Sequence, residues 1–187
     1  MSKIRLFLLS CSLCISAFSQ ISGLSTVTVG VGGGFPTGGA GTYLTHYLPD
    51  SAAVSAAYEF RLARYFAPEI GVANLIPNVL NLDPHRPAVA NRVRVTLLSF
   101  GGRGILPLLD GRAELFAGAG AVHVSGSESG FPGYGNASWL AQISGGGRIS
   151  LDKRRHFWLG PTARFSRDVG RPTQEWVSLT GDFGFRF

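Results

Sequence analysis

The C-terminal stretch of the chain is Val177-Ser178-Leu179-Thr180-Gly181-Asp182-Phe183-Gly184-Phe185-Arg186-Phe187. Large apolar side chains occupy most of the alternate positions from Val177 to Phe187, and Ser, Thr, Asp, Gly and Arg occupy the positions between them. Successive side chains of a β-strand point to opposite faces. A period of two therefore predicts a strand with one apolar and one polar face.

The same alternation recurs upstream, for example in residues 53–63 and 112–124. No long stretch repeats apolar residues at helical spacing, and glycine, of which the chain has 26, interrupts nearly every segment. A glycine costs about 1 kcal/mol in a helix interior, so the pattern favours an all-β fold. We expect eight strands, near residues 25–34, 53–63, 67–76, 91–102, 112–124, 137–149, 156–167 and 174–187.

The lengths of the strands and connections indicate where such a sheet resides. Most expected strands are long enough for the roughly 9–11 residues of a tilted strand that crosses a bilayer, whereas strands of soluble sheets have about 5–6. Long connections rich in Gly, Pro and Ser are expected at 35–52, 77–90 and 125–136. Shorter connections alternate with them, at 64–66, 103–111 and 150–155, and only 168–173 departs from this trend. This arrangement predicts an eight-stranded antiparallel up-and-down transmembrane β-barrel.

The two faces of the expected strands differ in chemistry. One face is aliphatic and aromatic, as lipid requires, and in the 91–102 strand we assign Val93, Val95 and Leu97 to it. The other face collects charged side chains among small residues, which suits a narrow lumen where guanidinium groups pair with carboxylates. The predicted lumen residues are Glu59, Arg61, Glu69, Arg92, Arg94, Arg112, Glu114, Arg148, Arg164, Asp182 and Arg186.

The N-terminus has the features of a secretory signal peptide. Lys3 and Arg5 precede an apolar stretch, and Ala17 and Ser19 are small residues at the −3 and −1 positions of a cleavage site. We expect residues 1–19 to be removed and residues 20–187 to form the barrel domain. Loss of Lys3 and Arg5 takes the 17 basic residues to 15 against 11 acidic ones, a net charge of +4. This mild charge does not indicate nucleic-acid binding.

A metal or cofactor is not expected. Both cysteines, Cys11 and Cys14, lie within the expected signal peptide, so the remaining chain has no thiolate ligand. The four histidines are far apart in the sequence and do not show metal-ligand spacing.

Together the signal peptide, the eight alternating segments and the C-terminal stretch resemble a known family. The chain is similar to the small eight-stranded outer-membrane β-barrels of Gram-negative bacteria, the porin-like group that includes OmpX, OmpW and the OmpA membrane domain. The resemblance implies location in the outer membrane and contact with its lipid and lipopolysaccharide. It also implies recognition by the barrel assembly machinery through an aromatic C-terminal signal, here Phe183, Phe185 and Phe187.

His123 and Ser125 form a weak catalytic candidate. Two residues apart on a strand, they share a face, and an imidazole can activate a hydroxyl for acyl transfer. Outer-membrane lipid A deacylases have a similar His-x-Ser pair. Here, however, the pair falls on the fifth strand instead of near the C-terminal one, and Gly126 replaces the usual Asn.

Three functions therefore stay open for the predicted barrel. The first is a structural or adhesin-like surface protein with a closed polar lumen, whose segments 35–52 and 77–90 bind an extracellular ligand. Candidate contact residues there are Tyr43, His46, Tyr47, His85 and Arg86. The second is a narrow channel for small anions, because seven predicted lumen arginines outnumber four carboxylates. The third is the acyl hydrolase.

Overall fold

The computed structural model describes residues 24–36, 51–77, 95–126, 138–168 and 175–187. The expected signal peptide lies outside these residues. The strands are β1 (Ser25–Pro36), β2 (Ser51–Phe60), β3 (Phe66–Pro77), β4 (Val95–Leu108), β5 (Ala113–Gly126), β6 (Ser138–Ser150), β7 (Phe157–Asp168) and β8 (Glu175–Arg186), with a 3₁₀ turn, η2 (Leu109–Gly111), between β4 and β5. Among the residues described, no helix is long and apolar enough to cross a membrane.

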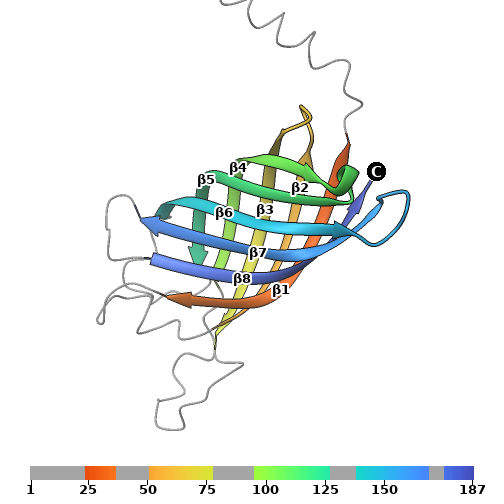
Figure 1. Cartoon of the computed structure of the whole chain (residues 1–187). Coiled ribbons are helices and arrows are strands. Elements are labelled where there is room, and N and C mark those ends of the chain that lie inside the picture. Colours follow the sequence, from red (N-terminus) through yellow and green to blue (C-terminus); the bar gives the residue numbers. More distant parts are fainter. Residues whose placement is uncertain (1–23, 37–50, 78–94, 127–137, 169–174) are drawn as a thin grey trace, which may run out of the picture.

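The strands form a closed barrel in which each pairs antiparallel with the next and β8 returns to β1 (Figure 1). The last ladder runs from Thr26 opposite Arg186 to Pro36 opposite Trp176. Beyond it, the Ser25 amide donates to the Phe187 carbonyl at 3.1 Å. Closure leaves no unpaired sheet edge, and the predicted eight-stranded antiparallel barrel is confirmed.

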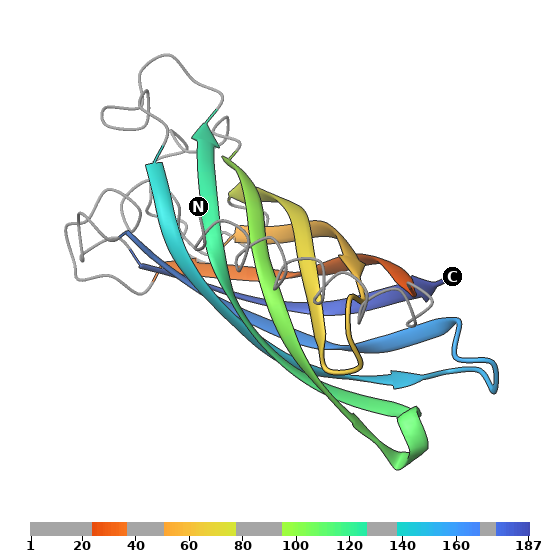
Figure 2. The same cartoon turned by 90° about the horizontal axis from the view of Figure 1, so that it is seen from above.

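The two ends of the barrel differ in their connections. Three short turns, residues 61–65, 109–112 and 151–156, lie at the end where β1 starts and β8 finishes (Figure 2). We call this the short-turn end. The other four connections leave from the opposite end, which we call the loop end, and lie outside the described residues.

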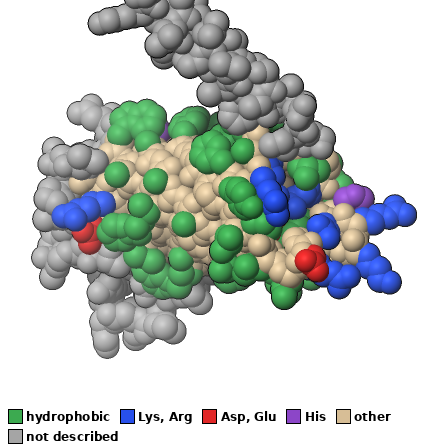
Figure 3. Space-filling view, turned by 45° about the horizontal axis from the view of Figure 1, so that its top comes forward, with side chains coloured by type: hydrophobic (Ala, Val, Ile, Leu, Met, Phe, Trp, Pro, Cys, Tyr) green, Lys and Arg blue, Asp and Glu red, His purple; other side chains and the backbone are tan. Residues whose placement is uncertain are grey.

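Side chains on the outer surface are mainly apolar. Val31, Ile143 and Leu179 are 66%, 60% and 53% exposed, and hydrophobic side chains cover much of the barrel wall in Figure 3. The intervening side chains point into the barrel, where most buried polar residues lie. A soluble β-sheet barrel has the opposite arrangement, with its apolar face inward.

The prediction of which β4 side chains face outward was wrong. Leu97 packs against the interior cluster, whereas Leu98 and Phe100 are 37% and 41% exposed on the outer face. Odd-numbered and even-numbered positions of this stretch are both apolar, so the sequence did not indicate which of them face outward. The strand also continues to Leu108, through residues that were expected to form a turn. Arg103, which is buried inside the barrel, fixes the register because a charge cannot face lipid cheaply.

Two hydrophobic clusters lie inside the barrel. The larger one is near the loop end and consists of Ala53, Leu75, Val122, Val124, Leu140 and Trp176, with Leu97 against it. The smaller one, nearer the short-turn end, consists of Ala67, Ile105 and Phe116. The interior is thus filled by side chains, as is usual for eight strands.

Candidate functional site

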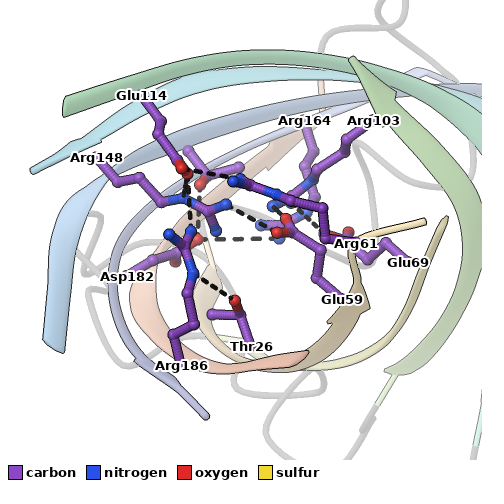
Figure 4. A network of polar contacts seen from close by, with 11 residues as sticks. Thr26, Glu59, Arg61, Glu69, Arg103, Glu114, Arg148, Arg164, Asp182 and Arg186 are labelled. Carbon is purple, nitrogen blue, oxygen red and sulfur yellow. Dashed lines mark hydrogen bonds and ion pairs between the residues drawn. The ribbon is translucent and has the colours of Figure 1, made fainter. Parts of the chain in front are cut away.

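Charged side chains fill the half of the barrel next to the short-turn end (Figure 4). We call this group the lumen network, and its members are Glu59, Arg61, Glu69, Arg103, Glu114, Arg148, Arg164, Asp182 and Arg186. They come from seven of the eight strands and, for Arg61, from the turn after β2. Arg186 also donates to the Thr26 hydroxyl of β1 at 3.3 Å, so all eight strands take part.

Glu114 is the centre of the network. Its Oε1 accepts from Arg61 at 2.8 Å, and its Oε2 accepts from Arg148 at 2.7 Å and from Arg186 at 2.9 Å. The carboxylate is 2% exposed, so these pairs are shielded from water. A buried charge is tolerated only when it is paired in this way.

Arg148 extends the network to a second carboxylate. Its Nη2 donates to Glu59 at 2.8 Å, and the other Glu59 oxygen lies 3.6 Å from Arg103. Arg103 in turn lies 2.6 Å from Glu69. These contacts form a chain of alternating charge across β6, β2, β4 and β3.

Aromatic rings pack against the guanidinium groups from within the lumen. Arg103 lies over the Phe116 ring at 4.4 Å, and Arg186 lies over the Trp158 ring at 4.1 Å from its centroid. Trp158 is 1% exposed. Such stacking holds a desolvated guanidinium in a fixed plane, which favours its pairing with carboxylates.

A second, smaller part of the network joins β7 to β8. The Thr162 hydroxyl donates to Asp182 at 2.6 Å, and Arg164 lies 4.0 Å from the same carboxylate. Gly30 leaves room for Asp182, because a Cβ at this position would lie 2.1 Å from Asp182 Oδ1. Small residues on the lumen face therefore make space for the charged ones.

The structure brings most of the predicted lumen residues together. Glu59, Arg61, Glu69, Glu114, Arg148, Arg164, Asp182 and Arg186 all belong to the lumen network. Arg92 and Arg94 lie outside the described residues. Arg112 was assigned wrongly: its exposed side chain belongs to the turn after η2, where the chain has left the strand alternation.

Three interior residues were missed. Arg103 lay in an expected turn, while Phe116 and Trp158 were not assigned to the lumen. Phe116 is two residues from Glu114 and so shares its face, a signal the sequence contained. With Arg103 included, the described network has five arginines and four carboxylates, an excess of one positive charge. The expected excess of three also counted Arg92 and Arg94, which lie outside the described residues.

The candidate catalytic pair lies on the outer face near the loop end. The His123 ring packs edge-on against exposed Trp139, with centroids 5.0 Å apart. The Ser125 hydroxyl donates to the Thr96 carbonyl at 3.5 Å. Among the described residues there is no group of three or more His, Cys, Asp or Glu that could hold a metal ion.

The proposed assembly residues form an aromatic row on the outer surface near the short-turn end. Phe183, Phe185 and Phe187 are all exposed, and the Phe185 and Phe187 rings stack with centroids 6.1 Å apart. Phe157 of β7 joins them at 6.0 Å from Phe183. Aromatic side chains in such a position are typical of the girdle at a membrane interface.

Comparison with known proteins supports the architecture. Neither a protein-family model nor a curated protein matches the chain. Among solved structures, the attachment invasion locus protein Ail of Yersinia pestis matches with a TM-score of 0.56 and 11% identity, covering 89% of this chain and 100% of Ail. The fold is that of the small outer-membrane β-barrels.

Two further structures agree. Neisserial surface protein A has a TM-score of 0.59 at 8% identity, covering 87% of this chain and 97% of that protein. The outer membrane protein OprG of Pseudomonas aeruginosa has a TM-score of 0.60 at 10% identity, covering 88% and 96%. At these identities the likeness establishes the fold alone.

Proposed function

We propose that the chain is an integral protein of the bacterial outer membrane, with its short-turn end toward the periplasm and its loop end toward the outside. The apolar outer surface, the aromatic row and the closed ladder support this, because lipid accepts only backbone whose hydrogen bonds are satisfied internally. Cleavage after Ser19, assembly through Phe183, Phe185 and Phe187, and contact with lipopolysaccharide belong to the same proposal.

Cell fractionation tests the location. We expect the protein to sediment with the outer membrane, to start near Gln20, and to run at different positions on SDS gels before and after boiling. A soluble periplasmic protein whose mobility does not depend on boiling would contradict the proposal.

The filled lumen carries the second part of the proposal, that the barrel is a closed support for surface recognition. Two layers of interior side chains lie one after the other along the barrel axis, and they support this proposal. The lumen network occupies the short-turn half, and the larger hydrophobic cluster, with Leu75 and Trp176 only 2% and 3% exposed, occupies the loop half. Ions crossing the barrel would have to displace both layers. We therefore favour a closed barrel over a narrow anion channel.

Planar-bilayer recording separates these two functions. A closed barrel gives no steady conductance, and the Arg148→Ala variant should then give none either. Anion-selective steps that change with Arg148→Ala or Arg94→Ala would establish the channel instead. The hydrolase alternative has no further support, and unchanged lipid deacylation in Ser125→Ala would remove it.

The surface ligand is proposed to be a sulfated polysaccharide, bound by segment 77–90. Ail, which shares this fold, has been crystallised with the heparin analogue sucrose octasulfate. Residues 78–90 lie outside the described residues and contain His85 and Arg86, whose basic side chains suit sulfate groups. Segment 35–52 would contribute Tyr43, His46 and Tyr47 to the same ligand.

Retention on immobilised heparin tests this ligand. Replacement of residues 78–90 by a Gly-Ser linker is expected to abolish retention. Replacement of residues 127–137, which contain no Lys or Arg, is the matched control and should leave retention unchanged. Equal retention of both variants and the parent protein would contradict the assignment.

A further inference from the structure

A cavity of about 650 Å³ opens at the short-turn end, away from the loops proposed for surface recognition. All three short turns and both chain ends of the barrel border it, through residues such as Arg64, Asp110, Arg155, Leu24 and Phe187. Its volume falls within the range of about 300–1,000 Å³ that is typical of small-molecule sites. The lumen network forms its floor.

Arginine dominates the walls of this cavity. Arg61, Arg64, Arg154, Arg155 and Arg186 line it, together with His156. Asp110 and Glu114 supply the acidic side chains of this lining, against five arginines. Figure 3 shows how Lys and Arg side chains gather at this end of the molecule.

The arginines form two tiers. Arg61 and Arg186 lie at the floor and are already paired with Glu114. Arg64, Arg154 and Arg155 are exposed, and among the described residues no carboxylate forms an ion pair with them. Arg64 comes from the β2–β3 turn and the other two come from the β6–β7 turn, on opposite sides of the barrel. The upper tier thus brings exposed cations to the mouth from opposite sides of the barrel.

The position of Arg155 is built into the fold. Its backbone has a φ of 63°, in the left-handed region that an arginine seldom adopts. Two hydrogen bonds hold the Arg155 backbone there. Its amide donates to the Asp152 backbone carbonyl at 3.2 Å, and the indole of buried Trp158 donates to the Arg155 carbonyl at 2.8 Å.

The guanidinium of Arg155 lies against the neighbouring β4–β5 turn. A Cβ placed on Gly111 would be 2.8 Å from Arg155 Nη1, and Gly111 itself has a φ of 77°. Unfavourable backbone conformations that neighbouring contacts enforce are often found at binding sites. The turn is therefore shaped to direct Arg155 along the cavity wall.

We propose that this cavity binds a small anion that carries two or more phosphate groups. Guanidinium groups match phosphate oxygens bidentately, and several arginines around one cavity favour a multiply charged anion over a single carboxylate. The excess of arginine over acidic side chains in the lining suits a diphosphate group. The phosphate could belong to a soluble compound of the periplasm or to an anionic lipid headgroup of the adjacent leaflet.

Isothermal titration with pyrophosphate tests the site, with the whole protein in phosphatidylcholine nanodiscs. We expect saturable binding that the triple variant Arg64→Gln/Arg154→Gln/Arg155→Gln weakens at least about tenfold, because three charge-assisted contacts are lost. Lys153→Gln and Arg112→Gln are matched controls: both positions are exposed at the same end but do not line the cavity. Each should change the affinity by less than about twofold. A mobility difference between unboiled and boiled samples shows that each variant is folded.

Two results would overturn the proposal: no saturable binding to the parent protein, or controls that weaken it as much as the triple variant, which would indicate diffuse surface charge. Nanodiscs that contain cardiolipin, whose headgroup carries two phosphates, then identify the source of the phosphate. If the anionic lipid competes with pyrophosphate, and the triple variant removes this competition, the site belongs to the lipid headgroup. If pyrophosphate binds as tightly as before, the site belongs to a soluble phosphate compound.

Discussion

Arg148 and Glu114 are direct cross-strand neighbours on β6 and β5, and the guanidinium Nε donates to the carboxylate at 2.7 Å. Their pairing places the most highly connected acid of the lumen beside the arginine that links it to Glu59. Removal of one member of a buried pair leaves its partner charged and unpaired, and this costs more than the pair itself contributes.

Glu114→Gln is therefore expected to lower the free energy of unfolding by about 3–5 kcal/mol, because three arginines lose their common counter-charge. Urea unfolding in lipid vesicles measures this loss. Glu175→Gln is the control, since Glu175 pairs with the half-exposed Arg167 at 3.3 Å. An exposed pair contributes at most about 1 kcal/mol. Similar losses in both variants would show that the lumen network is not insulated from solvent.

Leu179→Arg tests whether the outer face meets lipid. Leu179 is 53% exposed near the middle of β8, and a charge there should cost about 2–4 kcal/mol if lipid surrounds it. Leu109→Arg is the control, because Leu109 is 75% exposed in a turn outside the strands. Urea unfolding in vesicles measures both. If the wall faced water, Leu179→Arg would change stability by no more than about 0.5 kcal/mol.

Gly30→Ala tests the tight packing around the lumen network. The added Cβ would lie 2.1 Å from Asp182 Oδ1 and 2.6 Å from Ser55 Oγ, so the carboxylate must shift and its hydrogen bond with Thr162 is disturbed. We expect a loss of about 1–3 kcal/mol in urea unfolding, as for other overpacked interiors. Gly181→Ala, whose Cβ would meet its nearest atom at 3.9 Å, should be neutral. A neutral Gly30→Ala would mean that the lumen is looser than described.

The β6–β7 turn should lose stability in acid. Asp152 accepts a hydrogen bond from the Phe157 amide at 2.9 Å, and this bond lowers the pKa of its carboxyl below the ordinary value. A lowered folded-state pKa means that the stabilisation is complete above the ordinary aspartate pKa of about 3.9 and disappears as the pH falls through the lowered value. NMR titration of the Asp152 carboxyl should give a midpoint below 3.9. A midpoint at or above that value would contradict the bond.

The alternation of side chains was enough to predict the barrel and most of its lumen, because lipid outside and charge inside impose opposite chemistry on alternate positions. The prediction failed where neighbouring positions are both apolar, as at Leu97 and Leu98. It also failed where a strand is longer than its alternating segment, as β4 is beyond Arg103. The partner of each charge could not be predicted either. Glu114 and Arg61 meet across the lumen, and that contact depends on the stagger of strands that are not adjacent in the sheet.

The hydrogen bonds between Ser25 and Phe187 join the first and last residues of the barrel, so its assembly cannot be completed before the last strand is available. Until β8 joins the sheet, β1 and β7 each keep one row of unpaired amides and carbonyls, which hydrocarbon does not tolerate. An intermediate without β8 would also lack Asp182 and Arg186, and with them part of the interior charge balance. Insertion into the membrane and closure of the barrel are therefore coupled, and the sheet can enter the bilayer only when β8 completes it.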